Sequence, residues 1–140
     1  MLATSQPKFI CNDGAHQKYK QTQVQSANKE QLVILMFEGA IRFCRTMKLK
    51  IDEGNIKDSY YYQTKALQVM AELANSLNAE ETELGKTLLK LYEYITVEIA
   101  KINPVNKNSK KLIEVTGILE ELLTTLKQAF GYKIKLAEGR

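Results

Sequence analysis

Residues 29–54 read KEQLVILMFEGAIRFCRTMKLKIDEG, and this stretch decides the fold class. Its apolar residues recur at about 100° per residue, the spacing of an α-helix. One side of that helix would hold Leu32, Leu35, Met36, Gly39, Phe43, Met47 and Lys50. Asn28 with Gln31 three residues on is typical of a helix start, and Gly54 is typical of a stop. The pattern therefore predicts a helix over 29–53.

Three more stretches have helical spacing, over 55–77, 79–102 and 109–130. The second helix presents Tyr62, Ala66, Val69, Met70, Leu73 and Leu77; the third, capped by Asn78, presents Leu84, Leu88, Leu91, Tyr92, Ile95, Ile99 and Ile102; the fourth presents Leu112, Val115, Leu119, Leu123, Leu126 and Phe130. Pro104 ends the third helix and Gly131 the fourth. Because the links are short, the sequence predicts an all-α fold, an antiparallel up-and-down four-helix bundle over 29–131. We expect a flexible N-terminal segment over 1–28 and a frayed tail over 132–140.

Composition limits the possible functions. A chain of 140 residues with 44% hydrophobic and 26% charged residues fits one globular domain. The net charge of +4 comes mainly from scattered lysines, whereas nucleic-acid binders concentrate basic residues on one face. No apolar run reaches the roughly 18 residues of a membrane span. Cys11 and Cys44 lie far apart, which favours a reducing, cytoplasmic location. We expect neither nucleic-acid binding nor membrane insertion.

Catalytic residue patterns are missing from the sequence. The single histidine, His16, lies before the first helix, and no glutamate is followed three residues later by histidine, as a di-iron bundle requires. Cys44 lies within an apolar helical pattern and is expected to be a packed side chain. No phosphate-binding glycine loop or metal-spaced cysteine pair occurs. The sequence thus predicts a protein that is not an enzyme, with no catalytic, cofactor-binding or metal site.

The helices carry more apolar residues than one core stripe needs. Residues 32–37 are all apolar and cover every side of a helix. The surplus positions chosen as candidates are Val33, Phe37 and Ile41 on the first helix, Leu67 on the second, and Leu89 and Val97 on the third. A wide core stripe is the alternative explanation for each of them. Together they favour an exposed apolar groove that binds a partner helix.

The N-terminal segment contains isolated apolar residues among polar ones. They are Phe9, Ile10, Tyr19 and Val24. Such residues can attract a partner, or they can cover an apolar surface of the same chain. Composition alone leaves both interpretations open.

Two stretches give the chain a family resemblance: YKQTQVQSANKEQL over 19–32 and ILMFEGAIRF over 34–43. They resemble the opening of the flagellar export chaperone family FliS. Further matches follow in order, with LYEYI over 91–95, EVTGIL over 114–119 and KQA over 127–129. Two positions depart from the family pattern, where Lys29 replaces a proline and Leu126 a tryptophan. The likeness extends from Tyr19 to about Phe130.

This resemblance implies a function. Members of the family bind the disordered C-terminal segment of flagellin in the cytoplasm, prevent its premature polymerisation and present it to the flagellar type III export gate. The resemblance also implies that the N-terminal segment, through Ile10, Tyr19 and Val24, covers the groove or contacts the gate. A free chaperone is expected to be a monomer or weak dimer. The alternative is a helical scaffold that pairs with its own copy through the same apolar flank.

Overall fold

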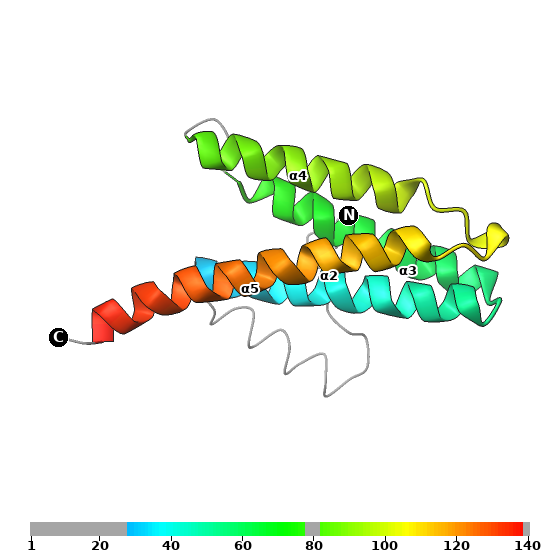
Figure 1. Ribbon diagram of the computed structural model, residues 1–140, viewed down its shortest axis with the longest axis horizontal. Helices are drawn as coiled ribbons and strands as arrows, with labels where there is room; N and C mark the ends of the chain where they lie inside the picture. Colours follow the sequence, from blue (N-terminus) through cyan, green and yellow to red (C-terminus); the bar gives the residue numbers. More distant parts are fainter. Residues whose placement is uncertain (1–27, 78–81, 139–140) are drawn as a thin grey trace, which may run out of the picture.

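The computed structural model describes residues 28–77 and 82–138, with side chains placed as far as residue 131. It contains four α-helices and one short 3-10 helix in these ranges, namely α2 (Lys29–Asp52), α3 (Ile56–Asn75), α4 (Glu83–Ala100), η2 (Pro104–Asn106) and α5 (Lys110–Glu138). The four α-helices pack together, which confirms the predicted all-helical class (Figure 1). The expected roles of Ile10, Tyr19 and Val24 concern residues outside the described ranges.

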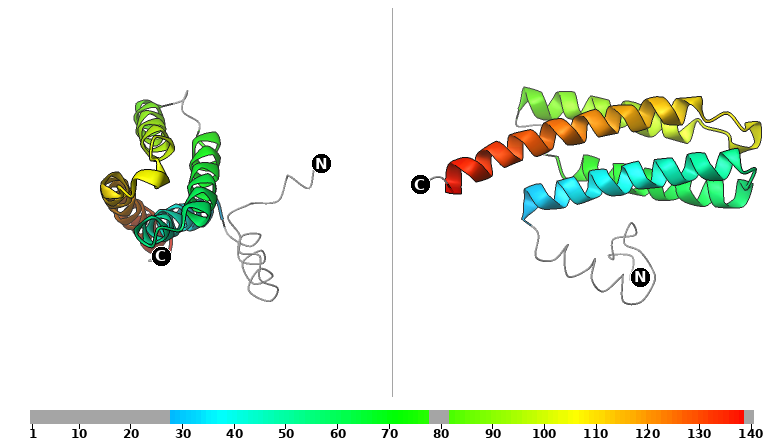
Figure 2. Two further views of the ribbon diagram at one scale, coloured as in Figure 1. Left: turned by 90° about the vertical axis from the view of Figure 1, so that its right-hand side faces the viewer. Right: turned by 60° about the horizontal axis from the view of Figure 1, so that its bottom comes forward.

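The four helices form a ring when the bundle is seen end-on (Figure 2). Helix α2 packs against both α3 and α5, and α3 packs against α4. The contact between α4 and α5 is much less extensive than that between α2 and α3. Starting from the turn at η2, α4 and α5 diverge towards the opposite end of the bundle (Figure 1). One side of the ring is therefore incompletely closed.

Local hydrogen bonds at the first two helix starts match the sequence prediction. The Asn28 side chain accepts from the backbone N–H of Gln31 at 2.8 Å, and the Gln31 side chain accepts from the Asn28 N–H at 3.2 Å. Asn55 caps α3 by accepting from the N–H of Asp58 at 3.0 Å. Between them Gly54 adopts a φ of +79°, a conformation that glycine tolerates best. These residues fix the hairpin of α2 and α3.

Two predicted boundaries were wrong. The N-cap of α4 is Thr82, whose hydroxyl accepts from the Gly85 N–H at 2.8 Å, so the helix begins at Glu83 rather than at 79. Helix α5 runs through Gly131 to Glu138, where an end at Gly131 and a frayed tail were expected. Gly131 lacks the positive φ of a terminating glycine. A glycine inside a helix costs only about 1 kcal/mol and does not stop it.

The core is one cluster shared by all four α-helices. Its buried apolar residues are Met36, Phe37, Ala40, Ile41, Cys44, Met47, Ile51, Ala66, Val69, Met70, Leu73, Tyr92, Ile95, Ile99, Ile102, Leu112, Val115 and Leu119. A polar contact adds to this packing, because the amide of Gln63 on α3 donates to the carbonyls of Ile99 and Ile102, each at 2.9 Å. These bonds connect α3 to the last turn of α4 and to Ile102, which follows that helix.

The buried side of α2 differs from the predicted one. Met36, Gly39 and Met47 are buried as predicted, but the predicted Leu32, Leu35 and Phe43 are only half-buried. The side that faces the core instead carries Phe37, Ala40, Ile41, Cys44 and Ile51. This rotation of about one residue follows from the continuous apolar run 32–37, which does not define a helical phase.

Candidate functional site

The core stripe of α5 is incompletely covered in its second half. Leu112, Val115 and Leu119 are fully buried at 0% exposure. Leu122 and Leu126 continue the same side of the helix at spacings of three and four residues, yet both are only half-buried. Both still pack against the core, so the bundle covers this stripe only in part beyond Leu119.

The core stripe of α4 is incompletely covered at the same end of the bundle. Tyr92, Ile95 and Ile99 are buried, whereas Leu88 and Leu91, which continue the stripe towards the helix start, are half-buried. Leu84, another turn back, is 69% exposed. We call the incompletely covered residues of both helices, Leu84, Leu88, Leu91, Leu122 and Leu126, the α4–α5 seam.

The direction of the two helices, and not their length, explains why this seam stays open. At 1.5 Å per residue, the 18 residues of α4 span about 27 Å and the 29 residues of α5 about 44 Å. Leu122 and Leu126 lie about 18 and 24 Å from the start of α5, within the span of α4, so helix length does not uncover them. The two helices instead diverge away from η2 (Figure 1). Apolar stripes left incompletely covered in this way are typical of surfaces that bind another protein.

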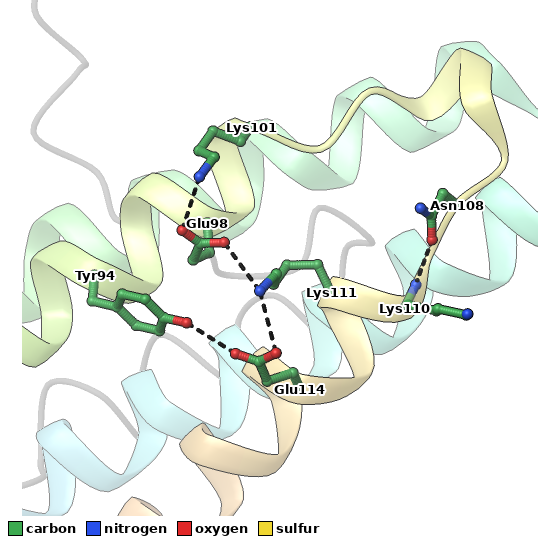
Figure 3. A network of polar contacts seen from close by, with 7 residues as sticks. All are labelled: Tyr94, Glu98, Lys101, Asn108, Lys110, Lys111 and Glu114. Atoms are coloured by element: carbon green, nitrogen blue, oxygen red, sulfur yellow. Dashed lines mark hydrogen bonds and ion pairs between the residues drawn. The ribbon is translucent and has the colours of Figure 1, made fainter.

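A polar network fastens α4 to α5 at the opposite end, next to η2 (Figure 3). The Tyr94 hydroxyl donates to Glu114 Oε2 at 2.9 Å. The ammonium of Lys111 lies 3.4 Å from Glu98 Oε1 and 3.2 Å from Glu114 Oε1, and Lys101 lies 3.2 Å from Glu98 Oε2. We call these five residues the clasp. The clasp holds the helices together where the seam narrows.

The clasp keeps its charges at neutral pH. Hydrogen bonds from Lys101 and then Lys111 hold the pKa of Glu98 below its usual 4.5. The bond from Tyr94 lowers the pKa of Glu114, and the bond to Glu114 raises the pKa of Lys111 above 10.5. Each shift favours the charged partner, so the network is intact at pH 7. The network therefore joins α4 to α5 at the end of the bundle near η2.

The described residues contain no arrangement suited to catalysis or metal binding. Cys44 is buried, and the loss of solvation raises the pKa of its thiol to about 12, which keeps it neutral and unreactive. Within 28–77 and 82–138 no three His, Cys, Asp or Glu side chains are placed to hold a metal ion. No helix in these ranges is both long and apolar enough to span a membrane.

The structure does not bring the six predicted groove residues together on one exposed surface. The expected exposure was wrong for Phe37 and Ile41, which are 0% and 4% exposed and belong to the core. Val33 and Leu67 are half-buried against that core, and Leu89 is half-buried on α4. Val97 is 51% exposed. A binding role for these residues stays a prediction.

The sequence predicted four of the five seam residues on the core stripe; Leu91 and Leu126 do pack against the core while half-buried, Leu88 is half-buried, and Leu84 is exposed. Leu84, Leu88, Leu91 and Leu126 have core periodicity and were therefore assigned to the core stripe. The divergence of α4 from α5 had no counterpart in the sequence pattern.

A helical bundle whose core stripes are incompletely covered at one end has the architecture of a protein-binding module. The comparison with protein families specifies the class further, because residues 12–132 match the model of the flagellar protein FliS. The chain belongs to the FliS family of flagellar secretion chaperones, which are not enzymes. This membership confirms the resemblance found in the sequence.

Individual relatives agree with the family match. The chain is 26% identical over 113 residues to the flagellar secretion chaperone FliS of Campylobacter jejuni, covering 80% of this chain and 88% of that protein. It is 24% identical over 121 residues to the FliS of Bacillus subtilis, with 86% and 90% covered. For the FliS of Vibrio cholerae the identity is 28% over 115 residues, with 78% and 83% covered.

Proposed function

We propose that this protein is a cytoplasmic chaperone that binds the disordered C-terminal segment of flagellin. By holding that segment it prevents premature polymerisation and delivers flagellin to the flagellar type III export apparatus. The observation that carries the proposal is the α4–α5 seam, an apolar surface on a member of a secretion chaperone family. No cofactor takes part in this function.

The seam suits a segment that folds as it binds. An amphipathic helix presents apolar residues at i, i+3, i+4 and i+7, which can lie on the matching spacing of Leu84, Leu88 and Leu91. Ordering a disordered segment costs conformational entropy, so the interface must be large. The half-buried Leu122 and Leu126 of α5 add to this apolar surface on the other side of the seam.

Co-purification tests this proposal directly. The chain is mixed with the flagellin encoded in the same genome, either complete or lacking its C-terminal segment, and complexes are sized by light scattering. We expect a one-to-one complex with complete flagellin and none with the truncated form. Equal binding of both forms would contradict the role of the C-terminal segment.

The alternative is a helical scaffold that pairs with its own copy. The exposed Tyr60 and Tyr61 on α3, each 46% exposed, leave an apolar surface that such pairing could use. A scaffold would be a stable dimer and would keep its mass when flagellin is added. The free chaperone is expected to be a monomer or weak dimer, which gives up any self-association when it binds flagellin.

The N-terminal segment is proposed to cover the binding surface through Ile10, Tyr19 and Val24. A cover competes with flagellin, so the apparent affinity equals the intrinsic affinity multiplied by the fraction of open molecules. Removing residues 1–18 together with Tyr19→Ala is expected to tighten binding of the isolated flagellin segment, measured by calorimetric titration. Markedly weaker binding by a folded variant would show that the segment belongs to the binding surface. Because Tyr19 is also proposed to contact the export gate, the variant should export flagellin poorly.

A further inference from the structure

Polar side-chain contacts join α4 to α5 at one end of the bundle. In the part of the chain whose side chains are described, they are the hydrogen bond of Tyr94 to Glu114 and the ion pair of Lys111 with Glu98, both in the clasp (Figure 3). Lys111 also lies 3.2 Å from Glu114 Oε1, so its ammonium connects one carboxylate of each helix. Lys111 is therefore central to the attachment of α4 to α5.

The first half of α4, residues 83–91, has no comparable attachment. Its side-chain hydrogen bonds and ion pairs to described residues all involve Thr82 or Glu83, at the start of the same helix. Three seam leucines, Leu84, Leu88 and Leu91, lie in this half. Apolar packing holds it in place, and such packing is not directional, so it fixes the tilt of a helix less strictly than hydrogen bonds do.

The last turn of α4 is held from a second side by α3. The amide of Gln63, a residue only 8% exposed, donates to the carbonyls of Ile99 and Ile102. Glu98, on the same turn and equally buried, accepts from Lys111 on α5. Polar contacts in such buried surroundings are stronger than exposed ones. This end of α4 is thus anchored to two helices and can serve as a pivot.

The opposite side of the seam, α5, is fastened to α2. Arg45 pairs with Glu120, and the ammonium of Lys127 lies 3.3 Å from Glu38 Oε2. These two ion pairs lie on α5 next to its seam leucines. Exposed ion pairs contribute little stability by themselves, but α2 also packs more extensively against α5 than α4 does. Of the two helices that border the seam, α4 is therefore the one with more freedom to tilt.

A small rotation at the pivot becomes a large displacement at the start of α4. Leu84 lies about 21 Å from Glu98 along the helix. A tilt of about 10° at Glu98 would move Leu84 by about 4 Å, which is the contact distance between two apolar side chains. A segment that must contact the leucines of both helices would lose one set of contacts after such a movement.

We propose that Lys111 is a positioning residue for partner binding, because by joining Glu98 to Glu114 it fixes the pivot about which α4 tilts. It thereby sets the width of the α4–α5 seam at the end remote from η2, without touching the bound segment. This role rests on the proposed function and extends it. The apparent affinity is reduced by the fraction of molecules whose seam has the wrong width, so a defined pivot strengthens binding.

Hydrogen exchange of the free chain tests the pivot. Lys111→Met keeps an unbranched apolar side chain and removes the charge, whereas Lys111→Arg keeps the charge. The matched control is Lys110→Met, because Lys110 is an exposed neighbour that forms no ion pair with the described residues. For Lys111→Met, mass spectrometry should show about threefold to tenfold faster exchange in peptides from 83–91 and wild-type exchange in the α2–α3 hairpin. Lys111→Arg and Lys110→Met should leave both regions unchanged.

Calorimetric titration with the isolated flagellin C-terminal segment measures the consequence for binding. Lys111→Met should bind about threefold to tenfold more weakly, whereas Lys111→Arg and Lys110→Met should stay within about twofold of the wild type. Tyr94→Phe removes one hydroxyl group of the clasp from a side chain that is 41% exposed, so folding is preserved. It should change exchange and affinity in the same direction as Lys111→Met, by a smaller factor.

The results separate the pivot from the proposed function. Unchanged exchange of 83–91 in Lys111→Met would overturn the pivot. Faster exchange confined to the clasp, or equal in all helices, would overturn it too, because the role of Lys111 would then be local or global stability. Faster exchange of 83–91 with wild-type affinity would overturn the positioning role and leave the chaperone function standing. If the wild-type chain does not bind the flagellin segment, the proposed function and the positioning role both fail, whereas the exchange measurement still confirms or overturns the pivot.

Discussion

Replacing Leu88 and Leu122 together by aspartate is expected to lower affinity for the flagellin C-terminal segment by at least ~100-fold. Burying a leucine side chain contributes roughly 1.5–3 kcal/mol, and each 1.4 kcal/mol changes an equilibrium constant about tenfold. Both residues are half-buried on opposite sides of the α4–α5 seam. When the bound segment covers the seam, the carboxylate of an aspartate there would lose its contact with water, and this desolvation weakens binding further.

Calorimetric titration measures this effect, and Leu49→Asp is the matched control. Leu49 is a leucine of α2 that is 53% exposed and lies outside the seam, so its replacement should leave affinity within about twofold. Leu84→Asp serves as a second seam variant, because a residue 69% exposed can be changed with little effect on folding. If both seam variants are folded and bind as the wild type does, the flagellin segment binds elsewhere.

The sequence was most informative where neighbouring helices cover the single apolar stripe of a helix. On α3 the predicted Ala66, Val69, Met70 and Leu73 are all fully buried. The caps at Asn28 and Asn55 were also predictable, because side-chain capping depends on residues only three positions apart. Local chemistry determines these features, so they can be read without knowing the tertiary structure.

Two features could not be predicted because tertiary packing decides them. The run 32–37 allows several helical phases, and only tertiary contacts, including that with Tyr92 on α4, select the one that buries Phe37. The seam depends on the angle between α4 and α5, which no local pattern records. Leu122 and Leu126 have the same spacing as buried residues and differ only in what lies opposite them. Periodicity therefore identified the apolar side of α5 without showing where its cover ends.

Phe37 provides the sharpest test of the revised core, because the sequence had placed it on an exposed flank. Its ring is fully buried and lies 6.0 Å from the ring of Tyr92, at an interplanar angle of 62°. This edge-to-face contact joins α2 to α4 across the bundle. Phe37→Ala is expected to lower the free energy of unfolding by roughly 3–5 kcal/mol, as replacing a packed aromatic residue leaves a cavity.

Urea unfolding followed by circular dichroism measures that loss, with Val97→Ala as the control. Val97 was assigned to the same groove but is 51% exposed, so its replacement should change stability by less than about 0.5 kcal/mol. Burial raises the pKa of the Tyr92 phenol to about 12. Removing the Phe37 ring would expose Tyr92 to water. Spectrophotometric titration of Phe37→Ala, at a urea concentration too low to unfold the variant, should therefore show a Tyr92 pKa closer to the ordinary 10. Unchanged stability together with weaker flagellin binding would instead return Phe37 to the binding surface that its sequence position suggested.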